Sequence, residues 1–232
     1  MNWEGLAGWW RSELAGDPSY AEEIEPIVMR FLDPVPGHRY LDVGCGDGRL
    51  MAAIARSGAE AIGVDIAGDL LREAVTQGPV VRLRLPDLSS FRTEAFDGAY
   101  VSLVLEHIED HRRALAEIAR VVRANGALAL VINHPTFTAP SSAPVDDGEE
   151  VLWRPGRYFG MGSTEEPVSD GTITFYHRPM ADLLNAASDA GWDLQRMEER
   201  GASGGQISRY PALARQRHVP RLLAVRWTRR PL

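Results

Sequence analysis

The sequence predicts an α/β fold, in which a mostly parallel sheet carries helices on both faces. Between residues 39 and 132, short apolar runs with strand character alternate with segments of helical spacing, and the connections are short. Such connections require parallel strands with helices covering the sheet. Polar residues gather where the strands end, which is where folds of this class bind ligands. The length of 232 residues suits one domain.

Residues 1–36 show apolar residues at helical spacing and no strand pattern. We expect two helices here, with a break near Asp17-Pro18 and an end before Pro34. Three tryptophans lie within the first ten residues (Trp3, Trp9 and Trp10). One interpretation is that they anchor this segment to the core.

A glycine-rich turn follows the first predicted strand, which spans Tyr40 to Val43. Glycines occupy positions 44, 46 and 48, and a helix is expected to begin near Asp47. Glycine allows a sharp turn and close approach to a ligand, and the helix start directs free N–H groups to the same place. The dinucleotide fingerprint would need its third glycine at Arg49, so the spacing disfavours a nicotinamide enzyme.

The second predicted strand spans Ala61 to Asp65 and ends in a carboxylate. Asp65 follows the glycines by about twenty residues, the position at which this class of fold binds ribose hydroxyls. A carboxylate can accept two such hydrogen bonds at once. The other elements expected up to residue 132 are helices over 48–57, 69–77 and 111–122 and strands over 80–84, from 96 onward and 127–132.

Residues 133–178 interrupt the strand–helix alternation with a long connection rich in Pro, Ser, Asp and Gly. Such connections are usually functional or disordered, and the aromatic and arginine content here argues against simple disorder. Before this connection, the helix expected over 111–122 should end in a left-handed cap at Asn125-Gly126. After the connection, the sequence predicts a helix from Met180 to Gly191, strands over 192–197 and 222–227, and a flexible stretch over 201–205.

Two motifs resemble those of the class I S-adenosylmethionine-dependent methyltransferases, of the small-molecule, type 11-like kind. Asp42-x-Gly44-x-Gly46-x-Gly48 is similar to motif I, and Phe96-Asp97 with the following strand and L-x-H-I-x-D turn is similar to motif IV. The resemblance covers about residues 38 to 228. It implies a Rossmann-like seven-stranded, mostly parallel sheet with an antiparallel last strand.

The resemblance also divides the single domain, 1–232, into four parts. Residues 1–36 would form a helical lid over the cofactor, residues 37–132 the cofactor-binding half, residues 133–178 a substrate cover and residues 179–232 the C-terminal half. The implied cofactor is S-adenosyl-L-methionine, with S-adenosyl-L-homocysteine as product. Its positive charge suits nearby carboxylates.

The residues that the resemblance implies for cofactor binding follow the strand ends. Ile66 would lie beside the adenine, Asp87 would meet the adenine amino group, and Ser102 would line the methionine end. Pro86 stands where the family usually has glycine. Cys45 is the only cysteine, which excludes an internal disulfide, and we interpret it as a packing residue. The full set is Asp42, Gly44, Cys45, Gly46, Asp65, Ile66, Asp87, Leu88, Ser102 and Leu103.

Methyl transfer requires alignment, and some acceptors also need a base. The candidate bases are His134, ranked first because it follows the fifth strand directly, then His177, and also His107 and Glu106. For each histidine, a structural role as a bonded residue is an equal alternative. We expect methyl transfer to an oxygen, nitrogen or carbon atom of a small molecule, without a metal. The alternatives are a non-methylation reaction on the same fold and a non-catalytic cofactor-binding partner.

Composition limits the classes of partner. The net charge of −7 and pI near 5.4 argue against nonspecific nucleic-acid binding. All 25 basic residues are arginines, and those of the basic tail, 209–230, are expected to form a solvated face. No apolar run suits a membrane span, and the first residues lack a signal peptide pattern, so we expect no membrane association and a cytoplasmic location. A monomer or homodimer is expected.

Overall fold

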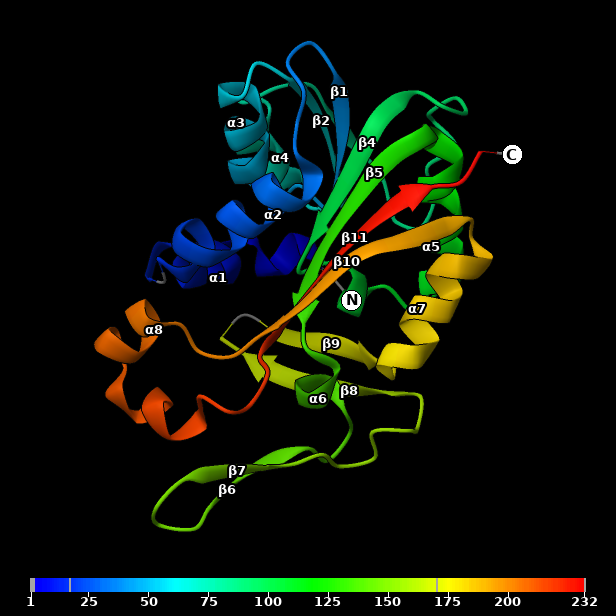
Figure 1. Ribbon diagram of the computed structural model, residues 1–232. Coiled ribbons are helices and arrows are strands. Elements are labelled where there is room, and N and C mark those ends of the chain that lie inside the picture. Colours follow the sequence, from blue (N-terminus) through cyan, green and yellow to red (C-terminus); the bar gives the residue numbers. More distant parts are fainter. Residues whose placement is uncertain (1–2, 17, 170, 232) are drawn as a thin grey trace.

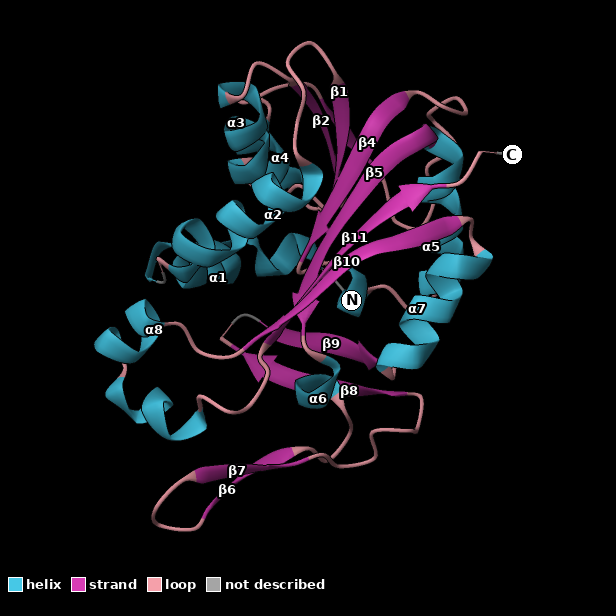
Figure 2. Cartoon of the chain, viewed as in Figure 1, coloured by secondary structure: helices cyan, strands magenta, loops and turns pink. Residues whose placement is uncertain are grey.

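The computed structural model describes residues 3–16, 18–169 and 171–231. Its centre is a seven-stranded sheet in the order β10-β11-β5-β4-β1-β2-β3 (Figures 1 and 2). β11 pairs antiparallel with both of its neighbours, and the other pairs are parallel. The predicted sheet is therefore confirmed. Its strands are β1 (Arg39–Val43), β2 (Glu60–Asp65), β3 (Val80–Arg82), β4 (Phe96–Ser102), β5 (Val122–Asn133), β10 (Trp192–Arg200) and β11 (Leu222–Arg229).

Helices cover both faces of the sheet (Figure 1). On one face, α2 (Glu25–Leu32), α3 (Arg49–Arg56) and α4 (Gly68–Ala74) pack on apolar residues of the strands. On the other face lie α5 (His111–Val121) and α7 (Met180–Asp189). The buried strands carry apolar side chains on both faces, which is what a sheet covered on both sides requires.

The N-terminal segment is helical, as predicted. α1 (Trp3–Gly16) is followed by a short π-helix, η1 (Tyr20–Ile24), which continues into α2. Pro18 lies in the predicted break, and Asp17 lies outside the described residues, as do Met1 and Asn2. Ala7 of α1 packs against Leu70 of α4. This contact places α1 beside the carboxyl ends of the strands.

The connection over 133–178 differs from the loop that we expected. After the short helix α6 (Pro135–Thr138) it forms two antiparallel hairpins below the sheet (Figure 2). The hairpins are β6 (Ala143–Asp146) with β7 (Val151–Arg154), and β8 (Gly162–Val168) with β9 (Gly171–His177). β6 and β8 of these hairpins are mostly exposed, so they lack the apolar alternation that would reveal them in the sequence.

One local prediction is wrong. Helix α5 ends at Val121 with an extended cap, and Asn125 adopts its left-handed φ of 63° inside β5, where the pairing with β4 shifts register. The stretch expected to be flexible, 201–205, has no regular structure over 201–203 and enters helix α8 (Gly204–Arg209) at Gly204. Ser203 and Gln206 form a reciprocal capping box at its start, which satisfies free N–H groups there.

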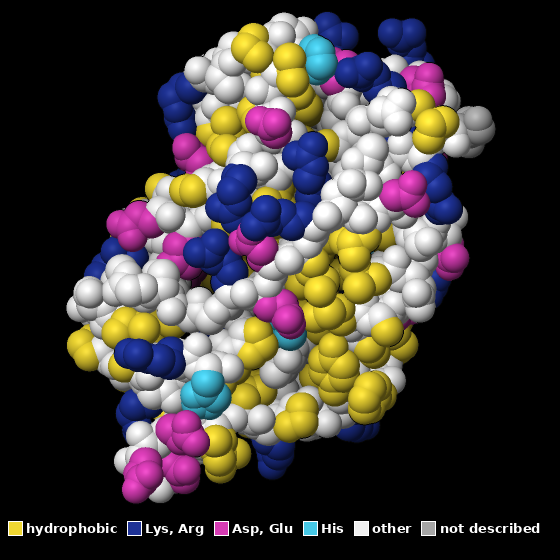
Figure 3. Space-filling view, in the orientation of Figure 1, with side chains coloured by type: hydrophobic (Ala, Val, Ile, Leu, Met, Phe, Trp, Pro, Cys, Tyr) yellow, Lys and Arg dark blue, Asp and Glu magenta, His cyan; other side chains and the backbone are white. Residues whose placement is uncertain are grey.

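Arginines at the surface are mostly paired with carboxylates. On the face shown in Figure 3, basic side chains gather over α2 and β10, where Arg30, Arg196 and Arg200 all contact Glu198. In the tail, Arg215 pairs with Asp146. The solvated face expected for the tail is found only in part: Arg217 and Arg230 are exposed, whereas Arg229 is buried and pairs with Glu94. No helix within the described ranges has the length and apolarity to cross a bilayer.

Candidate functional site

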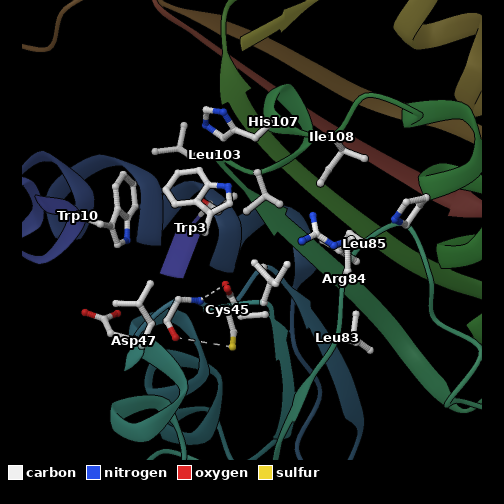
Figure 4. Close-up of a pocket in the computed structure, with 18 of the residues that line it drawn as sticks. Trp3, Trp10, Cys45, Asp47, Leu83, Arg84, Leu85, Leu103, His107 and Ile108 are labelled. Atoms are coloured by element: carbon white, nitrogen blue, oxygen red, sulfur yellow. Dashed lines mark hydrogen bonds between the residues drawn. The ribbon is translucent and has the colours of Figure 1, made fainter. Parts of the chain in front are cut away.

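A cavity of about 380 Å³ lies at the carboxyl ends of β1, β2 and β4. Figure 4 shows Trp3 and Trp10 on one side of it, Leu83 and Arg84 on the other, and Cys45 on the floor. Seven of the ten predicted cofactor residues line this cavity: Gly44, Cys45, Gly46, Asp65, Ile66, Ser102 and Leu103. The strand ends therefore bring most of the predicted set together.

The floor is the glycine turn after β1. Gly44 and Gly46 have φ values of 80° and 54°, a region that side chains disfavour. A Cβ on Gly44 would come within 2.4 Å of the Val104 side chain. The N–H groups of Gly44 and Cys45 both donate to the Val64 carbonyl, at 2.8 and 3.0 Å, which fixes the turn against β2. The turn is therefore both tight and rigid.

Asp65 connects this turn to the start of α4. One carboxylate oxygen accepts the Gly46 N–H at 2.9 Å, and the other accepts the Ala67 N–H at 2.9 Å. Burial raises the pKa of Asp65, and these two N–H groups counteract part of the rise. Each oxygen keeps a lone pair that can accept a ligand hydroxyl.

Asp42 lies beneath the floor and does not line the cavity. Its side chain is only 2% exposed, and burial raises its pKa well above the usual range, while the facing Tyr100 hydroxyl lowers it. Burial and then the charge of Asp42 raise the pKa of the Tyr20 phenol, which faces the Ser102 hydroxyl. Asp42 can therefore act on a ligand only through its field or through intervening groups.

Cys45 is a packing residue in this geometry, as we interpreted it. Its side chain is 7% exposed, and burial raises the pKa of the thiol. A thiol with a raised pKa stays protonated and is a poor nucleophile.

Asp87 and Leu88 do not line the cavity. The Asp87 carboxylate is exposed and accepts the Ser89 N–H at 2.9 Å, and Leu88 is buried in the core. The side chains that reach the cavity from the β3 connection come from residues 83–86 instead. Among them is Arg84, which points into the cavity in Figure 4.

Of the four candidate bases, only His107 lines the cavity; Glu106 is buried, and its carboxylate accepts a hydrogen bond from the Asn133 side chain at 3.1 Å. Its Nδ1 lies 2.9 Å from the Thr174 carbonyl oxygen, which can only accept, so Nδ1 carries the proton and Nε2 keeps a lone pair. The ring also contacts Trp3, with centroids 5.1 Å apart. His107 therefore presents an acceptor nitrogen in a defined tautomer.

His134, ranked first in the sequence, and His177 lie away from the cavity with both ring nitrogens bonded. His134 accepts the Thr136 N–H at Nδ1 and donates from Nε2 to Glu199 at 2.8 Å. His177 donates from Nε2 to the Tyr158 carbonyl. Burial lowers the pKa of both. This geometry matches the structural alternative given for each.

Arg178, not singled out from the sequence, fixes the turn that carries His107. It is 7% exposed, and its guanidinium donates to the Leu105 and Glu109 carbonyls at 3.0 Å and to the Ile108 carbonyl. Burial lowers its pKa to about 10, so it remains charged at neutral pH. The sequence gives no signal for this role, because the burial of Arg178 and its contacts 69 to 73 positions away are visible only in the structure.

The N-terminal segment forms the upper wall. Trp3, Trp10 and Tyr20 line the cavity. Glu4 holds α1 in place, because its carboxylate accepts the Gly68 N–H and pairs with Arg82, both at 3.0 Å. Only the clustering of tryptophans signalled this wall in the sequence.

Comparisons with known proteins agree with this geometry. A family model described as a methyltransferase domain matches residues 41–130. The ubiquinone biosynthesis O-methyltransferase of Hahella chejuensis is 33% identical over 52% of this chain and 54% of its own. An uncharacterized 37.1 kDa protein in a transposon of Streptomyces fradiae is 27% identical over 88% of this chain. The chain spans 63% of that relative, so it covers less than two thirds of either.

A solved structure gives a more complete match. The S-adenosylmethionine-dependent methyltransferase from Mesorhizobium loti aligns with a TM-score of 0.80 and 27% identity, over 93% of this chain and 100% of that one. The agreement therefore extends over both the sheet and the segments around the cavity. Fold, glycine turn and relatives together show that the chain is similar to the class I S-adenosylmethionine-dependent methyltransferases.

Proposed function

We propose that this chain transfers a methyl group from S-adenosylmethionine to an oxygen, nitrogen or carbon nucleophile of a small molecule. The observation that carries the proposal is the Asp65 carboxylate bonded to the Gly46 N–H at the floor of the cavity. One relative is named a ubiquinone biosynthesis O-methyltransferase, and this name supports a small molecule as the methyl acceptor. The acidic residues around the floor suit a positively charged donor.

The lining residues fit the parts of this cofactor. Asp65 would accept ribose hydroxyls, and Ile66 with the residues over 83–86 would enclose the adenine. Glycine at 44 lets the turn pack against Val104, with which a Cβ would collide, and the methionine portion would lie above this turn. Ser102 and Tyr20 would face the same end of the molecule.

When bound, S-adenosylmethionine supplies a methyl group that is already activated on a sulfonium. The protein then has to hold the acceptor in line and exclude water. Trp3, Trp10 and Leu103 form an apolar wall suited to that exclusion. For an acceptor hydroxyl, Nε2 of His107 is the base that we propose, because Nδ1 is committed to Thr174.

We further propose that the N-terminal residues up to 36 act as the lid and residues 133–178 as the cover of one methyltransferase domain. Trp3 and Tyr20 of the lid and Tyr176 of the cover contribute to the cavity wall, which supports both assignments.

Calorimetric titration with S-adenosylmethionine, S-adenosylhomocysteine and NAD tests the cofactor. We expect binding of the first two and none of NAD; binding of NAD alone overturns the proposal. The bound protein is then incubated with methyl-labelled donor and a panel of metabolites. A labelled product supports methyl transfer, whereas a rearranged product without the label indicates the non-methylation alternative.

A further inference from the structure

A second cavity, of about 210 Å³, adjoins the cofactor cavity. The two share Trp10, Tyr20 and Leu103 as a common wall. The second cavity lies between the N-terminal helices and the start of β11, with Asn133 from the end of β5 in its lining. A ligand in the second cavity would contact this common wall. Ser102 and Gly44 line the cofactor cavity on the other side of it.

Two carboxylates of this second cavity make no ion pair with any residue in the described ranges. They are Glu13 of α1 and Glu23 of η1. The Oε1 atom of Glu23 is closed off from solvent and accepts no hydrogen bond from the described part of the chain. Its neighbour Glu22, by contrast, pairs with Arg209 at 2.9 Å. A buried carboxylate oxygen without a donor is costly. Because Glu23 lines the cavity, a rotation of its side chain would offer this oxygen to a donor on a ligand.

The cavity also offers aromatic faces beside these carboxylates. Trp10 and Tyr20 both line it, and Tyr20 sits one helical turn from Glu23. Aromatic rings together with carboxylates form the environment that binds ammonium groups, through cation–π attraction and charge-assisted hydrogen bonds. The lining contains one cation, Arg221, whose guanidinium lies 3.4 Å from the Gln206 side-chain oxygen.

We propose that this second cavity binds the methyl acceptor and that the acceptor carries a cationic amino group held by Glu23. The inference rests on the proposed function, since it names the class of acceptor for the same cofactor cavity. An ammonium has no lone pair, so the amino group serves as the anchor. The methylated atom is a different nucleophile of the same molecule, which has to extend past Leu103 of the shared wall into the cofactor cavity, where His107 lies.

Three probes with the same phenol test the charge preference: tyramine, the neutral alcohol tyrosol and the anion 3-(4-hydroxyphenyl)propionate. A second pair, histamine and imidazole-4-ethanol, changes the ring. Each is titrated calorimetrically into protein saturated with S-adenosylhomocysteine. We expect at least one amine to bind about tenfold or more tightly than its neutral and anionic counterparts, as for one charge-assisted contact.

Glu23→Gln keeps the size of the side chain and should abolish this preference, while Glu22→Gln is the matched control and should retain it. Thermal melting and unchanged affinity for S-adenosylhomocysteine verify that both variants are folded. Equal or tighter binding of the neutral or anionic probes, or no binding of either amine at millimolar concentration, overturns the inference. Failure of S-adenosylhomocysteine to bind the parent protein would instead overturn the proposed function.

Discussion

The Gly46 N–H donates to the Asp65 carboxylate at 2.9 Å, which joins the turn after β1 to the end of β2. These two residues are 19 positions apart and come from neighbouring parallel strands. The bond aligns the turn and the carboxylate before any ligand arrives. A preorganised site of this kind loses less entropy on binding than one that must assemble.

Asp65→Ala should therefore weaken binding of S-adenosylmethionine by about tenfold or more, since it removes both the ribose acceptor and the support of the turn. Calorimetric titration measures the loss. Asp87→Ala is the matched control, because Asp87 also follows a strand but lies outside the cavity lining. Unchanged affinity in Asp65→Ala would contradict the assignment.

The floor of the site could be predicted because it depends on local spacing. Three glycines and a strand-ending acid determine which backbone atoms meet, whatever packs above them. The adenine side could not be placed as well. β3 ends at Arg82, two residues before the predicted end, so the connection turns early and brings Arg84 rather than Asp87 to the cavity. A shift of two or three residues lies within the usual error of predicted boundaries.

The histidines show a second limit of the sequence. His134 does follow β5, as predicted, yet its orientation is decided by Glu199 of β10, 65 residues later. His107, ranked lower, faces the cavity because Arg178 and Thr174 from the β9 region hold its turn. Contacts between such distant segments leave no periodic pattern that a sequence reading could use.

Asp42→Asn should stabilise the protein at neutral pH. Burial raises the pKa of Asp42 in the folded state. The folded protein therefore loses stability relative to the unfolded chain as the pH rises from about 4 through that raised pKa and Asp42 ionises. Asparagine removes this loss. The difference in melting temperature between the variant and the parent should increase with pH and then level off. Each kcal/mol of stability corresponds to about 2–4 °C.

Melting curves between pH 4.5 and 8 test this dependence. A difference that is constant with pH, or that shrinks as the pH rises, would be inconsistent with a buried ionised Asp42. At a pH above that raised pKa, where Asp42 is ionised beneath a cationic ligand, the same variant should also bind S-adenosylmethionine more weakly than the parent.

Glu4→Ala should speed the release of S-adenosylhomocysteine roughly threefold to tenfold, because Glu4 joins α1 to Gly68 and Arg82 above the cavity. The pair is partly exposed, so the effect is modest. Stopped-flow tryptophan fluorescence measures the rate, since Trp3 and Trp10 line the cavity. Glu22→Ala removes an ion pair elsewhere and should leave the rate unchanged; a parent-like rate in Glu4→Ala would argue against a lid.

His107→Gln should lower kcat on a hydroxyl acceptor by about 100-fold, the usual contribution of a positioned base. Because the variant has no imidazole Nε2 to accept the proton, only the chemical step should suffer, and the affinity for S-adenosylmethionine should stay within about twofold. His134→Gln is the comparison: it breaks the contact with Glu199 and should lower the melting temperature without lowering kcat. A 100-fold loss of kcat in His134→Gln, with parent-like kcat in His107→Gln, would overturn the assignment of His107 as the base.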